Sequence, residues 1–470
     1  MNEPSFVIER HPRLRILIPM VVAIAFLMEQ LDSTIITTAI PDMARNLATT
    51  PVRMNLAVTA YVLALAVFIP LSGWFADRYG ARRMFVCALG LFTAGSVLCG
   101  LAQDFAMLVA TRVLQGIGGA MMTPVGRLIL LRSFPRRELV TAMTYMTLPA
   151  IIGPVVGPLL GGFFTTYSSW RWIFYVNVPF GLIGILLALR YMEEVPGDRT
   201  VSFDFAGFAM FGCGVAMLQL AMEMTGRQTL PGAAVLALFA AAAILLLAFA
   251  RYARRVATPV VDLTLFRQRS FAIGTIAGGL CRVGMNGSPY LVPLMLQVGF
   301  GLSPIVSGSI TFLGSAGAIL IRLFIGALLR ICGFRSVLGA SAAIACVALA
   351  GYALIGPHTP HGLIVAYVIA FGLVRSTQYM SSNTLAYADV PHAQLSRATS
   401  LGGLIQQLTV SFGVSLAALL LGVVSPHGQM LTPARFHAVF LMMAALPLLA
   451  LPGFLRLRPE DGAQVSGYRR

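Results

Sequence analysis

The sequence contains no lysine, and all 33 of its basic residues are arginine. A phosphate-binding P-loop requires a lysine, and so does catalysis through a Schiff base, so both kinds of site are excluded. Charged residues make up only 11% of the chain, whereas hydrophobic residues make up 58%. A soluble domain keeps about a quarter of its residues charged. The composition therefore predicts a membrane protein.

Histidine and cysteine are also scarce. The six histidines fall in loops or at the ends of apolar runs, and the six cysteines lie inside apolar runs without C-x-x-C spacing. Neither pattern is typical of a metal site or of a disulfide framework. No H-E-x-x-H motif and no soluble domain are apparent. We therefore expect no metal, no cofactor and no enzyme, with a membrane enzyme or a sensor as remote alternatives.

Long apolar runs, by contrast, are abundant. A membrane-spanning helix needs about 20 mostly apolar residues. The first run is too long for the core of a signal peptide and is expected to be retained as a span. Fourteen runs meet the length requirement, over residues 16–40, 52–76, 83–102, 105–131, 138–165, 171–192, 204–223, 230–251, 270–297, 303–330, 334–356, 361–387, 397–424 and 434–456. The predicted fold class is an all-α membrane protein with 14 transmembrane helices.

The formal charge of +16 comes from 33 arginines against 17 acidic residues, and its meaning depends on where the arginines lie. With the N-terminus in the cytoplasm, most arginines between the runs fall on the inner side, as the positive-inside rule requires. Such arginines serve topology and anionic lipid headgroups, so no nucleic-acid partner is expected. We predict a multi-pass protein of the bacterial plasma (inner) membrane with both termini in the cytoplasm.

Two loops indicate an internal repeat. Between the second and third runs, Gly73 is followed seven residues later by Gly80. Between the tenth and eleventh runs, Gly326 is followed seven residues later by Gly333. An arginine stands two residues after the second glycine of each loop. Four residues after the first glycine, however, Asp77 in one loop matches an arginine in the other.

The repeat divides the chain if the two loops are equivalent. Residues 1–192 then form an N-terminal six-helix bundle, and residues 257–470 form a C-terminal six-helix bundle. Residues 193–256 hold an inserted pair of transmembrane helices, bounded by polar stretches.

Two carboxylates, Glu29 and Asp32, lie deep in the first run, three residues apart and hence on one helix face. A carboxylate in hydrocarbon is costly, so it normally faces the interior of a helix bundle and marks a functional site. Asp32 lies roughly 12 Å and Arg112 roughly 10 Å below the outer ends of their runs, at 1.5 Å per residue. We therefore expect Asp32 to pair with Arg112. Glu29 is deeper and less compensated, which makes it a candidate for proton uptake; a static cluster that only joins two helices is the alternative.

The motifs resemble those of the major facilitator superfamily, and more narrowly its fourteen-span drug/proton antiporter branch of the EmrB/QacA type. The similarity extends over nearly the whole chain. It rests on LDSTIITTAIP (31–41), GWFADRYGARR (73–83), LVATRVLQGIGGA (108–120), GPVVGPLLGG (153–162) and WRWIFYVNVPFG (170–181). The branch usually has a single acid in the first motif, so the extra Glu29 leaves the main proton carrier open between the two carboxylates.

The resemblance implies roles for two further motifs. In the loop after the second run, Asp77 would form a breakable cytoplasmic latch, within a gate made of Gly73, Asp77, Arg78, Gly80 and Arg82. The fifth run carries the antiporter motif: Gly153, Pro154, Gly157, Pro158, Gly161 and Gly162. Glycines four residues apart line one helix face and let another helix approach closely. We predict a bendable seam against the other bundle, and expect the aromatic residues of 170–181 to lie at the outer membrane interface.

The C-terminal bundle holds two further arginines at mid-depth, Arg282 and Arg375. They either bind backbone carbonyls at helix breaks near 284–289 or attract an anionic group of the substrate. The predicted substrate cavity comprises Glu29, Asp32, Arg112, Gln115, Arg282, Asn286 and Arg375.

The function that this implies is proton-coupled efflux of small organic compounds, of multidrug type, by alternating access. The alternative is proton-coupled export of organic anions or metal chelates. The expected partners are a small-molecule substrate, protons and membrane lipid; a periplasmic adaptor is compatible with this function but nothing in the sequence indicates one.

Overall fold

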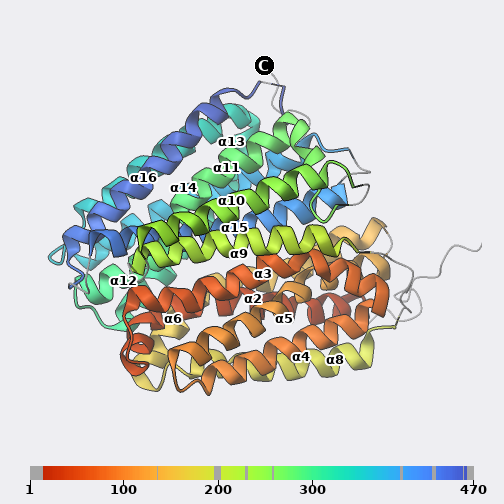
Figure 1. Cartoon of the computed structure of the whole chain (residues 1–470), viewed down its shortest axis with the longest axis horizontal. Helices are drawn as coiled ribbons and strands as arrows, with labels where there is room; N and C mark the ends of the chain where they lie inside the picture. Colours follow the sequence, from red (N-terminus) through yellow and green to blue (C-terminus); the bar gives the residue numbers. More distant parts are fainter. Residues whose placement is uncertain are drawn as a thin grey trace, which may run out of the picture. The chain divides into compact units, whose positions relative to one another are not determined.

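A computed structural model describes residues 14–462 except 135, 195–202, 228–230, 257–258, 392–394, 426–429 and 459. The described residues form helices over all fourteen predicted apolar runs (Figure 1). In a bilayer no water is available to the backbone, and a helix satisfies its own N–H and C=O groups. Eleven of the described helices are long and apolar enough to cross a membrane. The chain is a multi-pass, all-α membrane protein.

The chain divides into two compact units. Unit 1 comprises Met1–Thr49 and Leu56–Phe203, and unit 2 comprises Thr50–Asn55 and Asp204–Arg470. The helices of unit 1, with most of α3 included, are α2 (Leu14–Asn46), α3 (Pro51–Tyr79), α4 (Ala81–Gly100), α5 (Phe105–Ser133), α6 (Arg136–Tyr167), α7 (Trp172–Tyr175) and α8 (Asn177–Tyr191). Within this unit α2 packs along α6 and also touches α5 and α8. Helix α2 is therefore the central element of unit 1.

Unit 2 contains the remaining elements. These are α9 (Phe205–Arg227), α10 (Gly232–Ala253), η1 (Leu263–Arg267), α11 (Arg269–Asn286), α12 (Ser288–Leu294), η2 (Met295–Gly299), α13 (Pro304–Gly351), η3 (Tyr352–Leu354), α14 (His361–Ala388), α15 (Leu395–Val424) and α16 (Pro433–Leu455). The ninth predicted run, 270–297, is thus not one straight helix. It breaks between α11 and α12 around Gly287 and ends in a π-helical turn.

The two loops of the predicted repeat have the same backbone feature. Gly80 has a φ of 94° and Gly333 a φ of 70°, a region that side-chain-bearing residues rarely adopt. Gly333 interrupts α13, which therefore consists of the tenth and eleventh predicted spans joined by a sharp turn. A Cβ added at Gly73 or Gly326 would meet nothing within 4 Å. The matched positions thus share their local geometry.

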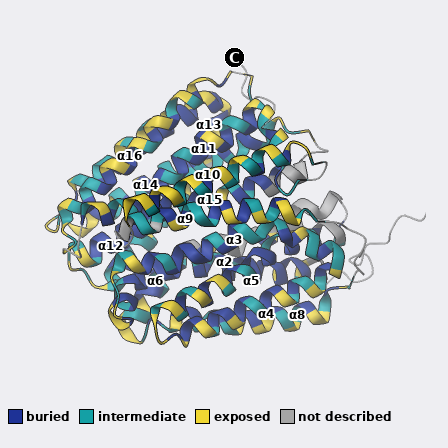
Figure 2. Ribbon diagram, viewed as in Figure 1, coloured by how far each residue is buried: buried dark blue, intermediate teal, exposed yellow. Residues whose placement is uncertain are grey.

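The predicted inserted pair, α9 and α10, belongs to the same compact unit as the C-terminal helices. Gln219 of α9 is buried and donates to Ser415 of α15, and Ser411 Oγ donates to Gln219 Oε1 at 3.3 Å. Helix α10 packs mainly against α9, and only 11% of the residues in its most apolar stretch are buried. Exposed and half-buried residues predominate along this helix (Figure 2). Helix α10 therefore presents most of its surface outward, as a lipid-facing helix does. The division of the chain into three parts remains a prediction.

Candidate functional site

The predicted pair between Asp32 and Arg112 is present in unit 1. Arg112 Nη1 lies 2.6 Å from Asp32 Oδ2, and neither side chain has any exposed surface. Asp32 comes from α2 and Arg112 from α5, two helices in contact. Equal depth on these helices brings the charges together, because each residue advances a helix by about 1.5 Å. A buried ion pair without water is costly unless further hydrogen bonds satisfy both groups.

Neutral side chains supply those hydrogen bonds to Asp32. Gln115 Nε2 donates to Asp32 Oδ1 at 2.8 Å, and Asn177 Nδ2 donates to the same oxygen at 3.3 Å. Gln115 Oε1 accepts from Arg112 Nη1 at 2.7 Å, which links the amide to both members of the pair. The described hydrogen bonds to the Asp32 carboxylate thus all come from N–H donors.

Arg112 is held by groups other than Asp32 as well. Its Nε donates to the backbone oxygen of Ala57 in α3 at 3.1 Å. The guanidinium lies 4.2 Å from the ring centroid of Tyr61, a cation–π distance. Its Nη2 is buried without a hydrogen-bond partner among the described residues. The contacts of Arg112 with Ala57 and Tyr61 therefore do not depend on the charge of Asp32.

Glu29 lies in a separate environment from Asp32. It is buried, with 8% of its surface exposed, and its Oε2 accepts a hydrogen bond from Thr123 of α5. Arg127, one turn further along α5, acts electrostatically on it. The two predicted carboxylates thus face the same helix, α5, at two levels, one beside Arg112 and one beside Thr123.

The glycines of the antiporter motif face α2. A Cβ at Gly153 would lie 2.8 Å from the backbone nitrogen of Leu31. A Cβ at Gly157 would collide with Thr34, and one at Gly161 with the backbone oxygen of Ile35. These glycines were predicted to form a seam against the other bundle. That prediction is wrong, because they pack against α2 within unit 1.

Threonines of α2 reinforce this seam. Thr34 Oγ1 lies 3.3 Å from the backbone oxygen of Gly153, and Thr38 Oγ1 lies 3.3 Å from that of Pro158. The residues four positions after these two carbonyls are Gly157 and Gly162 and not prolines, so the hydroxyls add contacts between α2 and α6 and do not replace a missing helical donor. Gly162 is buried in the same helix, and the side chain of Pro154 lies outside the described part of the chain. The close approach fixes the helix that carries both carboxylates.

The predicted gate lies at the Gly80 end of unit 1. Arg82 Nη2 donates to the backbone oxygen of Leu189 in α8 at 2.7 Å, and Arg83 Nε lies 2.5 Å from Glu194 Oε1. These two arginines tie the loop to the end of α8 and to Glu194 just beyond it. The role of Asp77, which is half-buried in the last turn of α3, remains a prediction.

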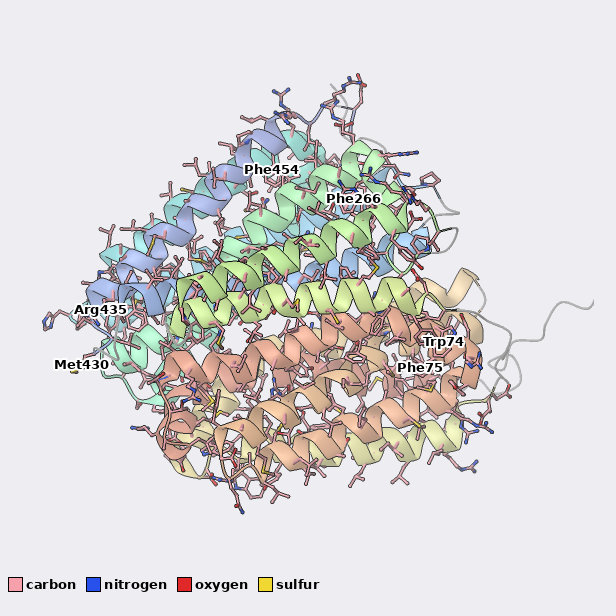
Figure 3. All side chains as sticks on the ribbon, in the orientation of Figure 1. Trp74, Phe75, Phe266, Met430, Arg435 and Phe454 are labelled. Atoms are coloured by element: carbon pink, nitrogen blue, oxygen red, sulfur yellow. The ribbon has the colours of Figure 1, made fainter. Side chains whose placement is uncertain are left out.

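Aromatic stacking accompanies these contacts. Trp74 lies at the end of α3 (Figure 3). The guanidinium of Arg78 lies 5.4 Å from the centroid of its ring, and the ring of Phe203 lies 5.5 Å from it. The remaining gate residue, Gly73, is exposed. The gate motif is thus packed at the end of α3 by aromatic rings of the same unit.

In unit 2, Arg282 is buried with 2% of its surface exposed. Its Nη2 donates to Ser382 Oγ at 2.8 Å and to Asn383 Oδ1 at 2.9 Å, both on α14. The expectation of backbone carbonyl partners near the helix break is therefore wrong, because neutral side chains of α14 bind Arg282. Asn286, the last residue of α11, lies at the nearby helix break, and its Oδ1 accepts a hydrogen bond from Tyr379 at 2.6 Å.

Arg375 belongs to the same region of unit 2. It is half-buried on α14, one helical turn before Tyr379, and both Arg282 and Arg375 act electrostatically on the Tyr379 hydroxyl. The nitrogen atoms Arg282 Nε and Asn286 Nδ2 are buried without partners among the described residues. Unit 2 thus holds a positively charged cluster whose described hydrogen-bond partners are neutral.

Asn177 and Ser96 belong to the site but were not predicted from the sequence. The stretch 170–181 was interpreted as an interfacial aromatic belt, but Trp170 and Phe174 have 1% of their surface exposed and belong to the core. The expectation fails for these two rings, whereas Trp172 of the same stretch has 50% of its surface exposed. An asparagine inside an apolar run was the available signal, since a buried amide needs polar partners.

Two units of packed membrane-spanning helices, one with a fully buried ion pair, are typical of a membrane transporter. The family model of the Major Facilitator Superfamily matches residues 22–285 and 274–470, so the chain belongs to this superfamily. It is therefore a transporter, not an enzyme.

Similar proteins agree with this assignment. The chain is 38% identical over 453 residues to a Pectobacterium atrosepticum protein named multidrug resistance protein MdtD, covering 96% of this chain and 97% of that protein. It is 36% identical over 461 residues to the protein of the same name from Escherichia coli strain 55989, covering 96% of each.

Solved structures share the fold. A bacterial homologue of the human lysosomal transporter Spinster superposes with a TM-score of 0.64 at 15% identity, covering 94% of this chain and 96% of that one. The nucleoside transporter NupG gives the same TM-score and identity, covering 93% of this chain and 99% of its own.

Proposed function

We propose that the protein exports small organic compounds in exchange for protons, as a multidrug transporter of the fourteen-span drug/proton antiporter branch. The relatives named multidrug resistance protein support the export of drug-like compounds. We place it in the bacterial inner membrane with both termini in the cytoplasm, in contact with anionic lipid. The predicted six-helix bundles, 1–192 and 257–470, would move against each other, with the helix pair of 193–256 inserted between them in the sequence.

One observation carries the proton coupling: the fully buried pair of Asp32 and Arg112. A buried ion pair stabilises a fold poorly compared with apolar packing, so its presence favours a functional role. Protonation of Asp32 would remove its attraction to Arg112 and loosen α2 from α5. Glu29, bound to Thr123, is the second carboxylate available for the same exchange.

Proton release by the purified protein tests this proposal. In weakly buffered detergent solution, adding the lipophilic cation ethidium is expected to release protons from the wild type, because a bound cation displaces the proton of a carboxyl group. The Glu29→Gln/Asp32→Asn double variant is expected to release none. In proteoliposomes, a pH gradient should accelerate ethidium transport by the wild type and not by the double variant.

The single variants identify the main carrier, because only the carrier's neutral replacement abolishes proton release. The exposed Glu460 provides a control, since Glu460→Gln changes the same functional group outside the helices. Gradient-driven transport that persists unchanged in the double variant would contradict the proposal.

The positively charged cluster of unit 2 supports a second candidate function, export of organic anions or metal chelates. A substrate carboxylate would accept from the unpartnered nitrogen of Arg282 and neutralise a cation that has no described acidic partner. Charge-assisted hydrogen bonds of this kind are the strong ones.

Neutral replacement of the two arginines tests the second candidate. Arg282→Gln/Arg375→Gln is expected to abolish transport of the anionic dye fluorescein and leave ethidium transport in place. Arg330→Gln, at an exposed arginine of the same unit, is the matched control and should change neither flux. Fluorescein transport that survives in the double variant would exclude the cluster as an anion site.

A further inference from the structure

The Asp32 site is built for an ionised carboxylate. Its described hydrogen bonds come from Arg112, Gln115 and Asn177, through N–H groups in every case. A carboxylate accepts only, so these donors match it. A protonated carboxyl also needs an acceptor for its O–H, because a buried donor without a partner is costly. One of the surrounding side chains must therefore supply an oxygen when Asp32 takes up a proton.

Arg112 cannot supply one, because a guanidinium has five donors and no acceptor. Gln115 is also fixed. Its Oε1 accepts from Arg112 Nη1 at 2.7 Å, so turning the amide would set two donors against each other. The orientation of Gln115 is thus determined by Arg112 for as long as the guanidinium stays in place.

Asn177 is free of that constraint. Ser96 Oγ donates to the backbone oxygen of Phe174 at 2.9 Å, so it can only accept from Asn177 Nδ2 at 3.1 Å. This fixes the nitrogen toward Asp32 and Ser96 while Asp32 is ionised. The other amide atom, Asn177 Oδ1, is buried without a hydrogen-bond partner among the described residues.

We propose that Asn177 is a positioning residue whose amide turns over when Asp32 is protonated, so that Oδ1 accepts the new O–H. The inference rests on the proton coupling proposed above. The proton enters from water and stays on Asp32, and Arg112 keeps its charge. The turned amide gives up the two bonds that Nδ2 donated, to Asp32 and to Ser96; Oδ1 then accepts the O–H of Asp32, and the Ser96 hydroxyl turns from Phe174 to donate to Oδ1 as well. Arg112 then loses the charge attraction of Asp32, while its contacts with Ala57, Tyr61, Gln115 and the ring of Phe174 remain.

The titratable groups around Asp32 limit where the proton can go. Arg112 comes from α5, Tyr61 from α3 and Cys99 from α4, and each interacts electrostatically with Asp32; Glu29 does so from the same helix. Arg112 faces Oδ2, so the proton is placed on Oδ1, the oxygen that faces Asn177. The amide and the acquired proton thus meet at one atom.

A pair of variants of equal shape separates this role from packing. Threonine carries a hydroxyl that both donates and accepts, whereas valine has the same outline and does neither. The readout is the infrared difference spectrum of the purified protein in lipid, titrated between about pH 9 and pH 4 to span ordinary and raised carboxyl values. The C=O band that is missing in Asp32→Asn belongs to the protonated Asp32.

In Asn177→Val this band is expected at higher wavenumber, because the carboxyl has lost its acceptor, and in Asn177→Thr near its wild-type position. Gradient-driven ethidium transport should fall about tenfold in the valine variant, the effect of one hydrogen bond to a buried carboxyl. The threonine variant should recover most of the transport.

An unshifted band in Asn177→Val, or equal losses in both variants, would overturn the role of Asn177. Absence of any Asp32 band from the wild type would instead overturn proton uptake by Asp32 itself, so the two failures are distinguishable.

Discussion

Arg112→Met is expected to destabilise the protein by about 3 to 5 kcal/mol, the cost of leaving one partner of a buried ion pair uncompensated. Asp32 has no exposed surface, so water cannot replace the guanidinium. The variant also removes the hydrogen bonds that the guanidinium donates to the backbone oxygen of Ala57 and to the amide oxygen of Gln115. Thermal unfolding of the purified protein in detergent, followed by intrinsic fluorescence, measures the effect.

The double variant Asp32→Asn/Arg112→Met is the control for this result. It removes the uncompensated charge, and asparagine still accepts from Gln115 at the same place. We expect it to regain the larger part of the lost stability and to remain without gradient-driven transport. If the double variant were as unstable as Arg112→Met, the loss would come from packing around the long side chain and not from the charge of Asp32.

Gly161→Leu is expected to have the second large effect, a loss of about 1 to 3 kcal/mol or more from overpacking. A Cβ at this position already collides with the backbone oxygen of Ile35 and with Thr38. A backbone atom cannot turn aside as a flexible side chain does, so α2 must move away from α6. Ile35 lies one turn from Asp32, so transport is expected to be lost together with stability.

Gly90→Ala in α4 is the matched control, because a Cβ there meets nothing within 4 Å. Alanine is the better helix former by about 1 kcal/mol, so this variant should be as stable as the wild type or more stable. Gly161→Ala measures the smallest version of the clash. If Gly161→Ala unfolded at the wild-type temperature, the seam between α2 and α6 would be looser than its geometry indicates.

The helical architecture and the central ion pair could be predicted because both depend on regular geometry. The apolar runs report span lengths directly, and equal depth on two helices was enough to pair Asp32 with Arg112. The loops of Gly80 and Gly333 were recognisable as equivalent because each of these glycines follows another glycine by seven residues. The positive φ at both positions confirms that interpretation.

The parts that could not be predicted depend on which helix lies beside which. A glycine every four residues defines a face of α6, but the sequence does not say that α2 covers it. The same limit applies to Arg282, whose partners lie about a hundred residues away on α14. Asn177 could not be predicted for a different reason. Its aromatic neighbours in the sequence are suitable for a membrane interface as well as for a core, and their burial depends on how the chain turns at α7.

The attachment of α9 to α15 through Gln219 has a practical consequence for observing the transport cycle. Helix α10 follows α9, and its side chains at Leu236 and Ile244 are largely exposed. In a background in which the exposed cysteines Cys87, Cys213 and Cys332 are replaced by serine, a fluorophore coupled to a cysteine introduced at either position would report the motion of the C-terminal unit. The hairpin of α9 and α10 is therefore a suitable place for one of the two labels in a single-molecule distance measurement.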